Sequence, residues 1–117
     1  MAVHLQGRGF SVLQCNYRVV GAELDLVCRD SDGLAFVEVR ARSPGPVEPS
    51  ATITSAKFRR LQRGARAWMA ERGLSPRQAT WRFVVATVVL DDQGQAASIE
   101  IIEDPFAHLP EYHHADP

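Results

Sequence analysis

Two short runs of the sequence, ELDLVCR and LAFVEVR, place acidic side chains among apolar ones at alternating positions. The charged residues that could do chemistry are Glu23 and Asp25 in the first run and Glu38 and Arg40 in the second. Carboxylates held close together repel each other, and a hard divalent cation relieves that repulsion. Mg²⁺ binds one or two carboxylates together with water and phosphate oxygens. The pattern therefore predicts a site for phosphoryl chemistry with Mg²⁺, or Mn²⁺, as its cofactor.

A β-hairpin is the element that would bring these residues together. Both runs are typical of strands, over 23–29 and 34–40, and the residues between them are typical of a turn. Because side chains alternate between strand faces, the first strand should divide into two sets, Glu23, Asp25 and Val27 on one face and Leu24, Leu26 and Cys28 on the other. If the turn closes with Arg29 opposite Leu34, the charged residues form two facing pairs, Asp25 with Glu38 and Glu23 with Arg40.

Arg40 has a narrower chemical role than the carboxylates. Its guanidinium can balance the charge of the site or the charge that builds on a transferring phosphate. It cannot act as a general base, because its pKa exceeds about 12. The sequence also leaves open a simpler interpretation, in which all four charged residues form a solvated face crossed by one ion pair.

The remaining elements follow from periodicity and from helix-ending residues. A short helix over 2–8 should end at Gly9, a strand should cover 10–18, and Gly21 should break the chain before the hairpin. A helix should run from Thr54 or Ser55 to about Arg72 and end at Gly73. Further strands are expected over 81–90 and 97–102. The apolar residues at helical spacing should pack on the sheet, namely Phe58, Leu61, Ala65, Trp68 and Met69.

Two segments have loop character. The Pro-rich residues 43–53 should form a mobile loop, and the tail from Asp104 onward, above all 107–117, should be loosely held. The sequence thus predicts a single α/β domain over 1–117, with a central mixed β-sheet flanked by helices.

Composition places the chain among soluble globular proteins. It has 117 residues, of which 45% are hydrophobic and 23% charged. No apolar run is long enough to cross a bilayer, and the first residues do not resemble a signal peptide, so a cytoplasmic location is expected. Cys15 and Cys28 lack the close spacing of a zinc site and are expected to be reduced packing residues. Trp68 and Trp81 are expected in the core.

Charge is distributed unevenly along the chain. The net charge is −1, yet residues 40–82 hold ten of the thirteen basic residues and only two acids. A locally basic segment can bind a polyanion even in a slightly acidic chain. The candidates for phosphate contacts are Arg42 after the second hairpin strand and the helical residues Lys57, Arg59, Arg60, Arg63 and Arg66. A solvated helix face is the alternative for the helical set.

Several segments, taken in order, resemble one known family. They are Asn16-Tyr17-Arg18, GAELDLV (21–27), LAFVEVRAR (34–42), TITSAKFRRLQRGARAWM (52–69), WRFVV (81–85) and IEDPF (102–106). The chain resembles the YraN-type family of uncharacterised bacterial proteins, which are similar to Holliday junction resolvases and to nucleases with the restriction-endonuclease-like fold. The hairpin with its carboxylates is the most specific part of this resemblance.

The resemblance implies roles for individual residues. Asp25 and Glu38 would bind the metal, Glu23 would match an additional acid, and Arg40 would stand where the fold usually has a lysine that orients the attacking water. The main-chain carbonyl of Val39 would be a further metal ligand. The chain departs from the family pattern at Arg40 and in three other ways. It begins inside a helix that usually carries a Gly-Glu. It also has Ala22 where the family has a glycine and Val84 where the family commonly has an aspartate.

Three functions are therefore weighed. The first is a divalent-metal-dependent nuclease, or a nuclease-like protein, that acts on DNA phosphodiesters, with branched DNA as one candidate substrate. The second is a catalytically inactive nucleic-acid-binding module, which the missing helix acid and Arg40 both favour. The third is an interaction domain that forms a homodimer.

Overall fold

The computed structural model describes residues 1–44, 54–103 and 105–106. The described elements are α1 (Ala2–Gly7), β1 (Ser11–Val19), β2 (Ala22–Asp30), β3 (Gly33–Arg42), α2 (Ser55–Glu71), β4 (Trp81–Leu90) and β5 (Ala96–Glu103). Every helix and strand expected from the sequence is present, with bounds that differ by one or two residues. Most of the expected loop over 43–53 and all of the expected tail over 107–117 lie outside the described residues.

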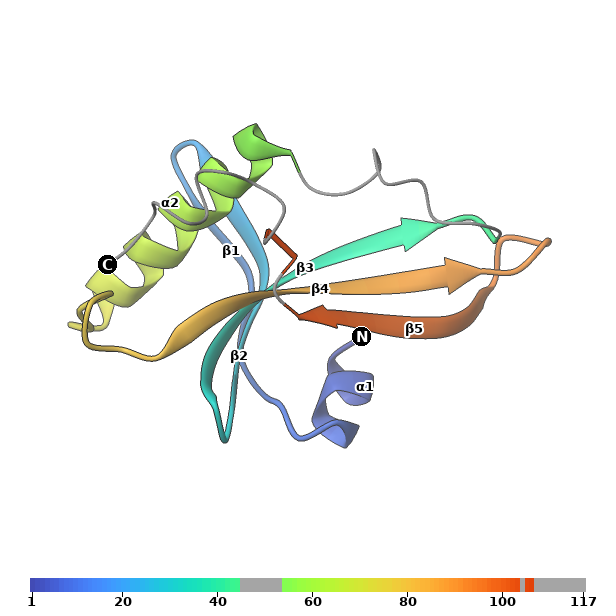
Figure 1. Ribbon diagram of the computed structural model, residues 1–117, viewed down its shortest axis with the longest axis horizontal. Coiled ribbons are helices and arrows are strands. Elements are labelled where there is room, and N and C mark those ends of the chain that lie inside the picture. Colours follow the sequence, from blue (N-terminus) through green and yellow to red (C-terminus); the bar gives the residue numbers. More distant parts are fainter. Residues whose placement is uncertain (45–53, 104, 107–117) are drawn as a thin grey trace.

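The five strands form one sheet in the order β1-β2-β3-β4-β5. Neighbouring strands are antiparallel except β3 and β4, which are parallel. A parallel pair needs a crossover, and α2 lies in the connection between these two strands. Figure 1 shows α2 over one side of the sheet and α1 below the other. The predicted α/β fold with a mixed sheet flanked by helices is therefore confirmed.

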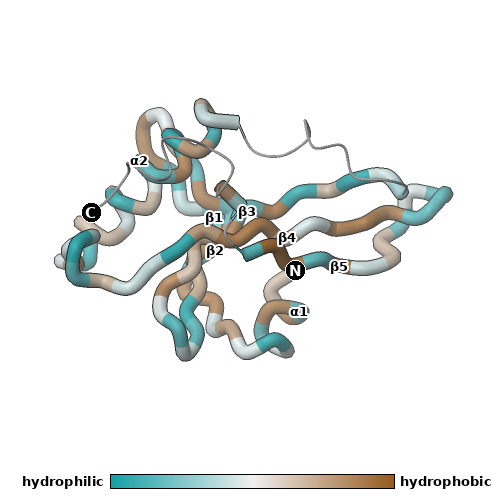
Figure 2. The backbone as a smooth tube through the Cα atoms, viewed as in Figure 1, coloured by the Kyte–Doolittle hydropathy of each residue, from teal (hydrophilic) through white to brown (hydrophobic). Residues whose placement is uncertain are grey.

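Helix α2 packs its apolar stripe into the core on its side of the sheet. All five residues of its predicted apolar stripe are buried, and they pack against Val27, Phe36 and Phe83 of the strands. Trp68 is in this cluster and Trp81 packs against it, as expected. Each large apolar side chain buried in this way contributes about 1.5–3 kcal/mol to folding. Figure 2 shows the hydrophobic residues gathered along the middle of the sheet, while the turn between β4 and β5 is hydrophilic.

The opposite face of the sheet has a smaller hydrophobic core, which lies between the sheet and α1. It includes Leu5, Leu26, Cys28, Val37 and Val84. Cys28 is buried as predicted, but the same prediction was wrong for Cys15, which is exposed on the edge strand β1; neither cysteine forms a disulfide.

Phe106 also departs from the sequence-based expectation. The chain from Asp104 onward was expected to be loosely held, yet Phe106 is fully buried, with its ring centroid 4.5 Å from that of Phe58 and 5.1 Å from that of Phe83. The aromatic contacts made after β5 explain the difference, since burial of a phenylalanine ring outweighs the entropy of a short segment.

Both ends of α2 are fixed. At its start, Thr54 is the N-cap and its Oγ1 accepts a hydrogen bond from the Lys57 N–H at 3.2 Å. Near its end, the Gln14 side chain on β1 accepts hydrogen bonds from Trp68 Nε1 at 2.9 Å and from Arg72 Nη2 at 2.7 Å. The helix is therefore held in a defined rotation over the sheet. In the part of the chain that the structure describes, no helix is long and apolar enough to cross a membrane.

Candidate active site

The predicted hairpin register is present over its turn-proximal half. Arg29 pairs with Leu34, and the ladder continues to Leu26 and Val37. The turn is tighter than expected, because the strands extend to Asp30 and Gly33 and leave only two residues between them. The hairpin was thus predicted in the correct register from its turn residues and alternation.

Beyond Leu26 and Val37 the two strands no longer pair. The predicted facing pairs, Asp25 with Glu38 and Glu23 with Arg40, are not partners in the ladder of the described strands. The Val39 N–H instead donates to Asp25 Oδ2 at 2.8 Å. The carboxylate of Asp25 therefore lies where β2 and β3 separate, and it binds the backbone of the opposite strand.

Glu23 has a different partner from the one predicted. Its Cα pairs with that of Arg18 on β1, and its Oε2 lies 3.1 Å from Arg18 Nε. The prediction that Glu23 faces Arg40 was wrong because β2 pairs with β1, and no longer with β3, at this point. Arg18 was not identified from the sequence. The sequence nevertheless contained a signal for this pair, since Arg18 and Glu23 flank Val20-Gly21 symmetrically and carry opposite charges.

Asp25 and Glu38 remain on the same side of the sheet despite the separation of their strands. Val27 and Phe36 pair across the hairpin and are buried under α2, and the two acids are the next residues on that face. The predicted alternation fails at Leu24, which packs in the α2 cluster with Val27 rather than with Leu26 and Cys28. Leu24 lies against α2, since a Cβ built on Gly64 would be 3.0 Å from its Cγ.

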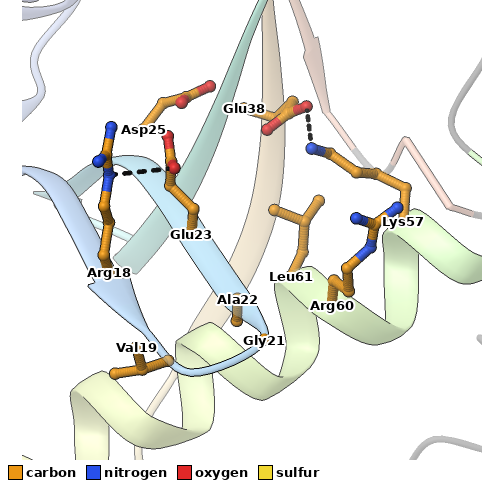
Figure 3. Close-up of a pocket in the computed structure, with 10 residues that line it drawn as sticks. All are labelled: Arg18, Val19, Gly21, Ala22, Glu23, Asp25, Glu38, Lys57, Arg60 and Leu61. Carbon is orange, nitrogen blue, oxygen red and sulfur yellow. Dashed lines mark ion pairs between the residues drawn. The ribbon is translucent and has the colours of Figure 1, made fainter.

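The two acids open into a cavity of about 480 Å³ between the β1–β2 turn and the first half of α2. Figure 3 shows both side chains reaching toward this space, with Glu23 beside Asp25 and Lys57 extending from the helix toward Glu38. The lining residues are Arg18, Val19, Gly21, Ala22, Glu23, Asp25, Glu38, Lys57, Arg60 and Leu61. Acidic groups and cations from four separate elements, β1, β2, β3 and α2, therefore meet in one cavity.

Glu38 is an acidic residue whose charged form is disfavoured by its surroundings. Its side chain is only 13% exposed, and its Oε2 lies 3.1 Å from Lys57 Nζ. Burial raises the pKa of Glu38 above its ordinary value, and the nearby Asp25 raises it further, while Lys57 opposes the shift. The site thus holds two interacting carboxylates and a single lysine that partly neutralises them.

The other predicted cations divide between the cavity and its surroundings. Arg60 lines the cavity, and Arg63 lies against the β1–β2 turn, where a Cβ built on Gly21 would be 2.6 Å from its Nη1. Arg59 is exposed on α2 and is not a lining residue. Arg42 reaches β5, with Nη2 3.3 Å from Glu100 Oε1.

Arg40 lies two residues beyond Glu38 on β3 and is half-buried. It is not among the residues that line the cavity, and no ion pair joins it to Asp25 or Glu38 within the described chain. The cation that meets Glu38 comes from the helix instead.

The donors present fit the protein's share of a magnesium site. Two carboxylates, those of Asp25 and Glu38, match the one or two that Mg²⁺ takes from a protein. No group of three or more His, Cys, Asp or Glu side chains that could hold a metal occurs among the described residues. A site built on these two acids would therefore need oxygen ligands from water, from phosphate or from the backbone.

The comparisons with known proteins agree with the resemblance seen in the sequence. The model of the uncharacterised protein family UPF0102 matches residues 1–88. A UPF0102 protein of Alkalilimnicola ehrlichii is 46% identical over 85 residues, which cover 72% of this chain and 67% of that protein. UPF0102 proteins of Nitratidesulfovibrio vulgaris and Moorella thermoacetica are each 35% identical over 106 residues, covering 90% of this chain and 76% and 87% of those proteins.

Proposed function

We propose that this chain, which belongs to the uncharacterised protein family UPF0102, is a divalent-metal-dependent nuclease, or a nuclease-like protein, that acts on DNA phosphodiesters. Branched DNA is included among the proposed substrates. We further propose that its sheet belongs to the restriction-endonuclease-like fold. The β1–β2–β3 meander, the crossover through α2 and the parallel strand β4 support that assignment.

One observation carries the proposal, which is the convergence of Asp25 and Glu38 in a cavity bordered by cations. A protein gains no stability from burying two interacting carboxylates, and the raised pKa of Glu38 records that cost. Groups perturbed in this way within a cleft are typical of functional sites. The lining cations Arg18, Lys57 and Arg60 give the same cavity an affinity for phosphate.

In this proposal, individual residues would have the following roles. Asp25 and Glu38 would hold the metal, and the Val39 carbonyl would be a third ligand. When bound, Mg²⁺ or Mn²⁺ polarises a phosphoryl oxygen and acidifies a water molecule. Glu23, held by Arg18, would tune the charge of the site. The nucleic-acid backbone would be bound by cations of the cavity and its surroundings, with Arg42 on β3 and Lys57, Arg59, Arg60 and Arg63 on α2.

A catalytically inactive nucleic-acid-binding module is the second candidate. Lys57 already contacts Glu38 at 3.1 Å and supplies a positive charge where a metal would supply one. The described residues also contain no cluster of three metal-binding side chains. In this alternative the carboxylates and Lys57 shape the cavity, while Arg18 and Arg60 bind phosphates.

Metal titration combined with a cleavage assay distinguishes the two candidates. Mn²⁺ and Mg²⁺ would be titrated by calorimetry into the wild type, Asp25→Asn and Glu38→Gln, with Asp92→Asn as a control that removes one exposed acid outside the cavity. Each protein would also be incubated with linear and four-way-junction DNA. The nuclease proposal expects binding and cleavage in the wild type and the control, and loss of both in the site variants. Salt-sensitive DNA binding without metal binding or cleavage would instead support the binding module.

A further inference from the structure

The cation that contacts the carboxylates comes from α2 rather than from β3. We propose that Lys57, and not Arg40, is the positioning cation of this site: it holds Glu38 through a direct ion pair and presents its remaining donors to the phosphate of the substrate. This inference rests on the proposed nuclease function and assigns a residue to it.

The ion pair is well defined in the structure. Lys57 Nζ lies 3.1 Å from Glu38 Oε2, with the lysine side chain 39% exposed and the glutamate 13% exposed. In Figure 3 the lysine stem extends from the first turns of the helix toward Glu38, and both residues line the cavity. The ammonium therefore faces the carboxylate on one side and the open cavity on the other.

The backbone of Lys57 is fixed by its surroundings. Its N–H is held by the Thr54 side chain in the N-terminal cap, and the next residue, Phe58, is buried in the core. One turn later, Leu61 is also buried and lines the same cavity. Because residues four apart lie on one side of a helix, Leu61 supports the side of α2 from which Lys57 extends. The rotation of the helix thus directs this lysine toward Glu38.

The chemistry of an ammonium group suits this position. It is a compact charge with three donors on a flexible stem, so one donor can hold Glu38 while the others bind phosphate oxygens in the cavity. Its positive charge also offsets the repulsion between Glu38 and Asp25. Arg40 is poorly placed for either task, since it neither lines the cavity nor pairs with the two acids in the described part of the chain.

Two measurable consequences follow. Removing the Lys57 charge while keeping the stem, as in Lys57→Met, should tighten Mn²⁺ binding by about three- to tenfold, because one competing positive charge beside Glu38 is lost. The same change should lower kcat by about a hundredfold with KM altered by less than about threefold, because the interaction is used with the reacting phosphate. Lys57→Arg should keep the Mn²⁺ affinity of the wild type and recover part of kcat.

The experiment compares four single variants: Lys57→Met, Lys57→Arg, Arg40→Met and Arg60→Met. Arg60 is the matched control, since it is the next cation of α2 in the cavity lining but does not pair with Glu38. Mn²⁺ affinity would be measured by calorimetry without DNA, kcat and KM with a DNA substrate, and folding by thermal unfolding. The proposal expects that Lys57→Met alone combines tighter Mn²⁺ binding with a lower kcat. Arg60→Met should raise KM and leave kcat and Mn²⁺ affinity unchanged.

Three results would overturn the inference. If the wild type binds Mn²⁺ and cleaves DNA, but Arg40→Met has the kcat defect and Lys57→Met does not, the positioning cation lies on β3 and the nuclease function stands. If Lys57→Met instead weakens Mn²⁺ binding, Lys57 supports the fold of the site rather than competing with the metal. If the wild type neither binds Mn²⁺ nor cleaves DNA, the proposed function fails together with this inference.

Discussion

The two ends of the β2–β3 hairpin place acids in opposite electrostatic situations. At the turn, Asp30 Oδ2 lies 2.8 Å from Arg82 Nη2, and Glu103 on β5 holds the same guanidinium through Nε at 3.0 Å. The hydrogen bond from Arg82 holds the pKa of Asp30 below its ordinary value. At the open end, Glu38 has Asp25 and Lys57 as neighbours, and its pKa is raised, chiefly by burial.

This difference separates an acid that stabilises the fold from an acid whose charged form is disfavoured. Asp30 is ionised in a pair that ties the hairpin turn to β4 and β5, so the pair contributes to stability. Glu38 sits in the same hairpin, yet its charged form costs stability. Natural proteins commonly retain such unfavourable arrangements where function requires them. The hairpin thus has a stabilising turn end and a destabilising open end, and the open end is where we propose the active site.

The largest expected effect is on catalysis at the open end. Glu38→Gln removes one of the two carboxylates proposed to bind the metal and should lower kcat by on the order of a thousandfold, which corresponds to about 4 kcal/mol of activation free energy. The free energy of unfolding should stay unchanged or rise, because a buried charge is lost. Single-turnover cleavage and urea denaturation measure the two quantities. Asp30→Asn is the control, and a comparable loss of kcat in that variant would contradict the division between the two ends.

The next effect is on stability at the turn end. Arg82→Met leaves Asp30 and Glu103 without their shared partner, and it should lower the free energy of unfolding by about 1–3 kcal/mol. Mn²⁺ affinity should not change, since Arg82 does not line the cavity. Urea denaturation and calorimetry test this prediction. A variant with normal stability but impaired metal binding would show that the turn end takes part in the site.

The two ends should also respond oppositely to pH. The pKa of Asp30 is lowered on folding, so its contribution to stability is present above the pKa of the unfolded chain, about 3.9, and is lost as the pH falls through the folded-state pKa. The pKa of Glu38 is raised, so its cost is absent below the unfolded-state pKa of about 4.3 and is fully present above the folded-state pKa.

Urea denaturation of three proteins over a range of pH tests this contrast. The stability gained by Glu38→Gln should be about 1 kcal/mol or less at neutral pH and should vanish in acid. Arg82→Met should lose part of the acid sensitivity that the wild type derives from Asp30. If the stability gained by Glu38→Gln instead grew as the pH fell, the direction assigned to the pKa shift of Glu38 would be wrong.

The sequence predicted what depends on local chemistry. The turn after Asp30, the alternation along the paired halves of both strands and the stripe of α2 are each encoded within a few neighbouring residues. The point at which the pairing of β2 with β3 ends was not predictable, because it depends on Asp25 accepting a hydrogen bond from the Val39 N–H of the other strand. The Lys57–Glu38 contact likewise depends on the rotation of α2 over the sheet, which is set by tertiary packing. Tertiary packing also determines the burial of Phe106.

The smallest expected effect compares one arginine near each end of the β2–β3 hairpin, Arg18 on the neighbouring strand β1 and Arg29 on β2. Arg18 lines the cavity with its side chain 74% exposed, whereas Arg29 is exposed beside the turn and does not line it. Arg18→Gln should weaken DNA binding by about two- to fivefold and reduce the salt dependence by about one phosphate contact, while Arg29→Gln should change neither. Fluorescence anisotropy over a series of salt concentrations measures both quantities. Because the two substitutions remove the same charge from neighbouring strands, equal effects would mean that DNA senses only the overall charge of the protein. A difference confined to Arg18 would locate the bound backbone at the open end of the hairpin.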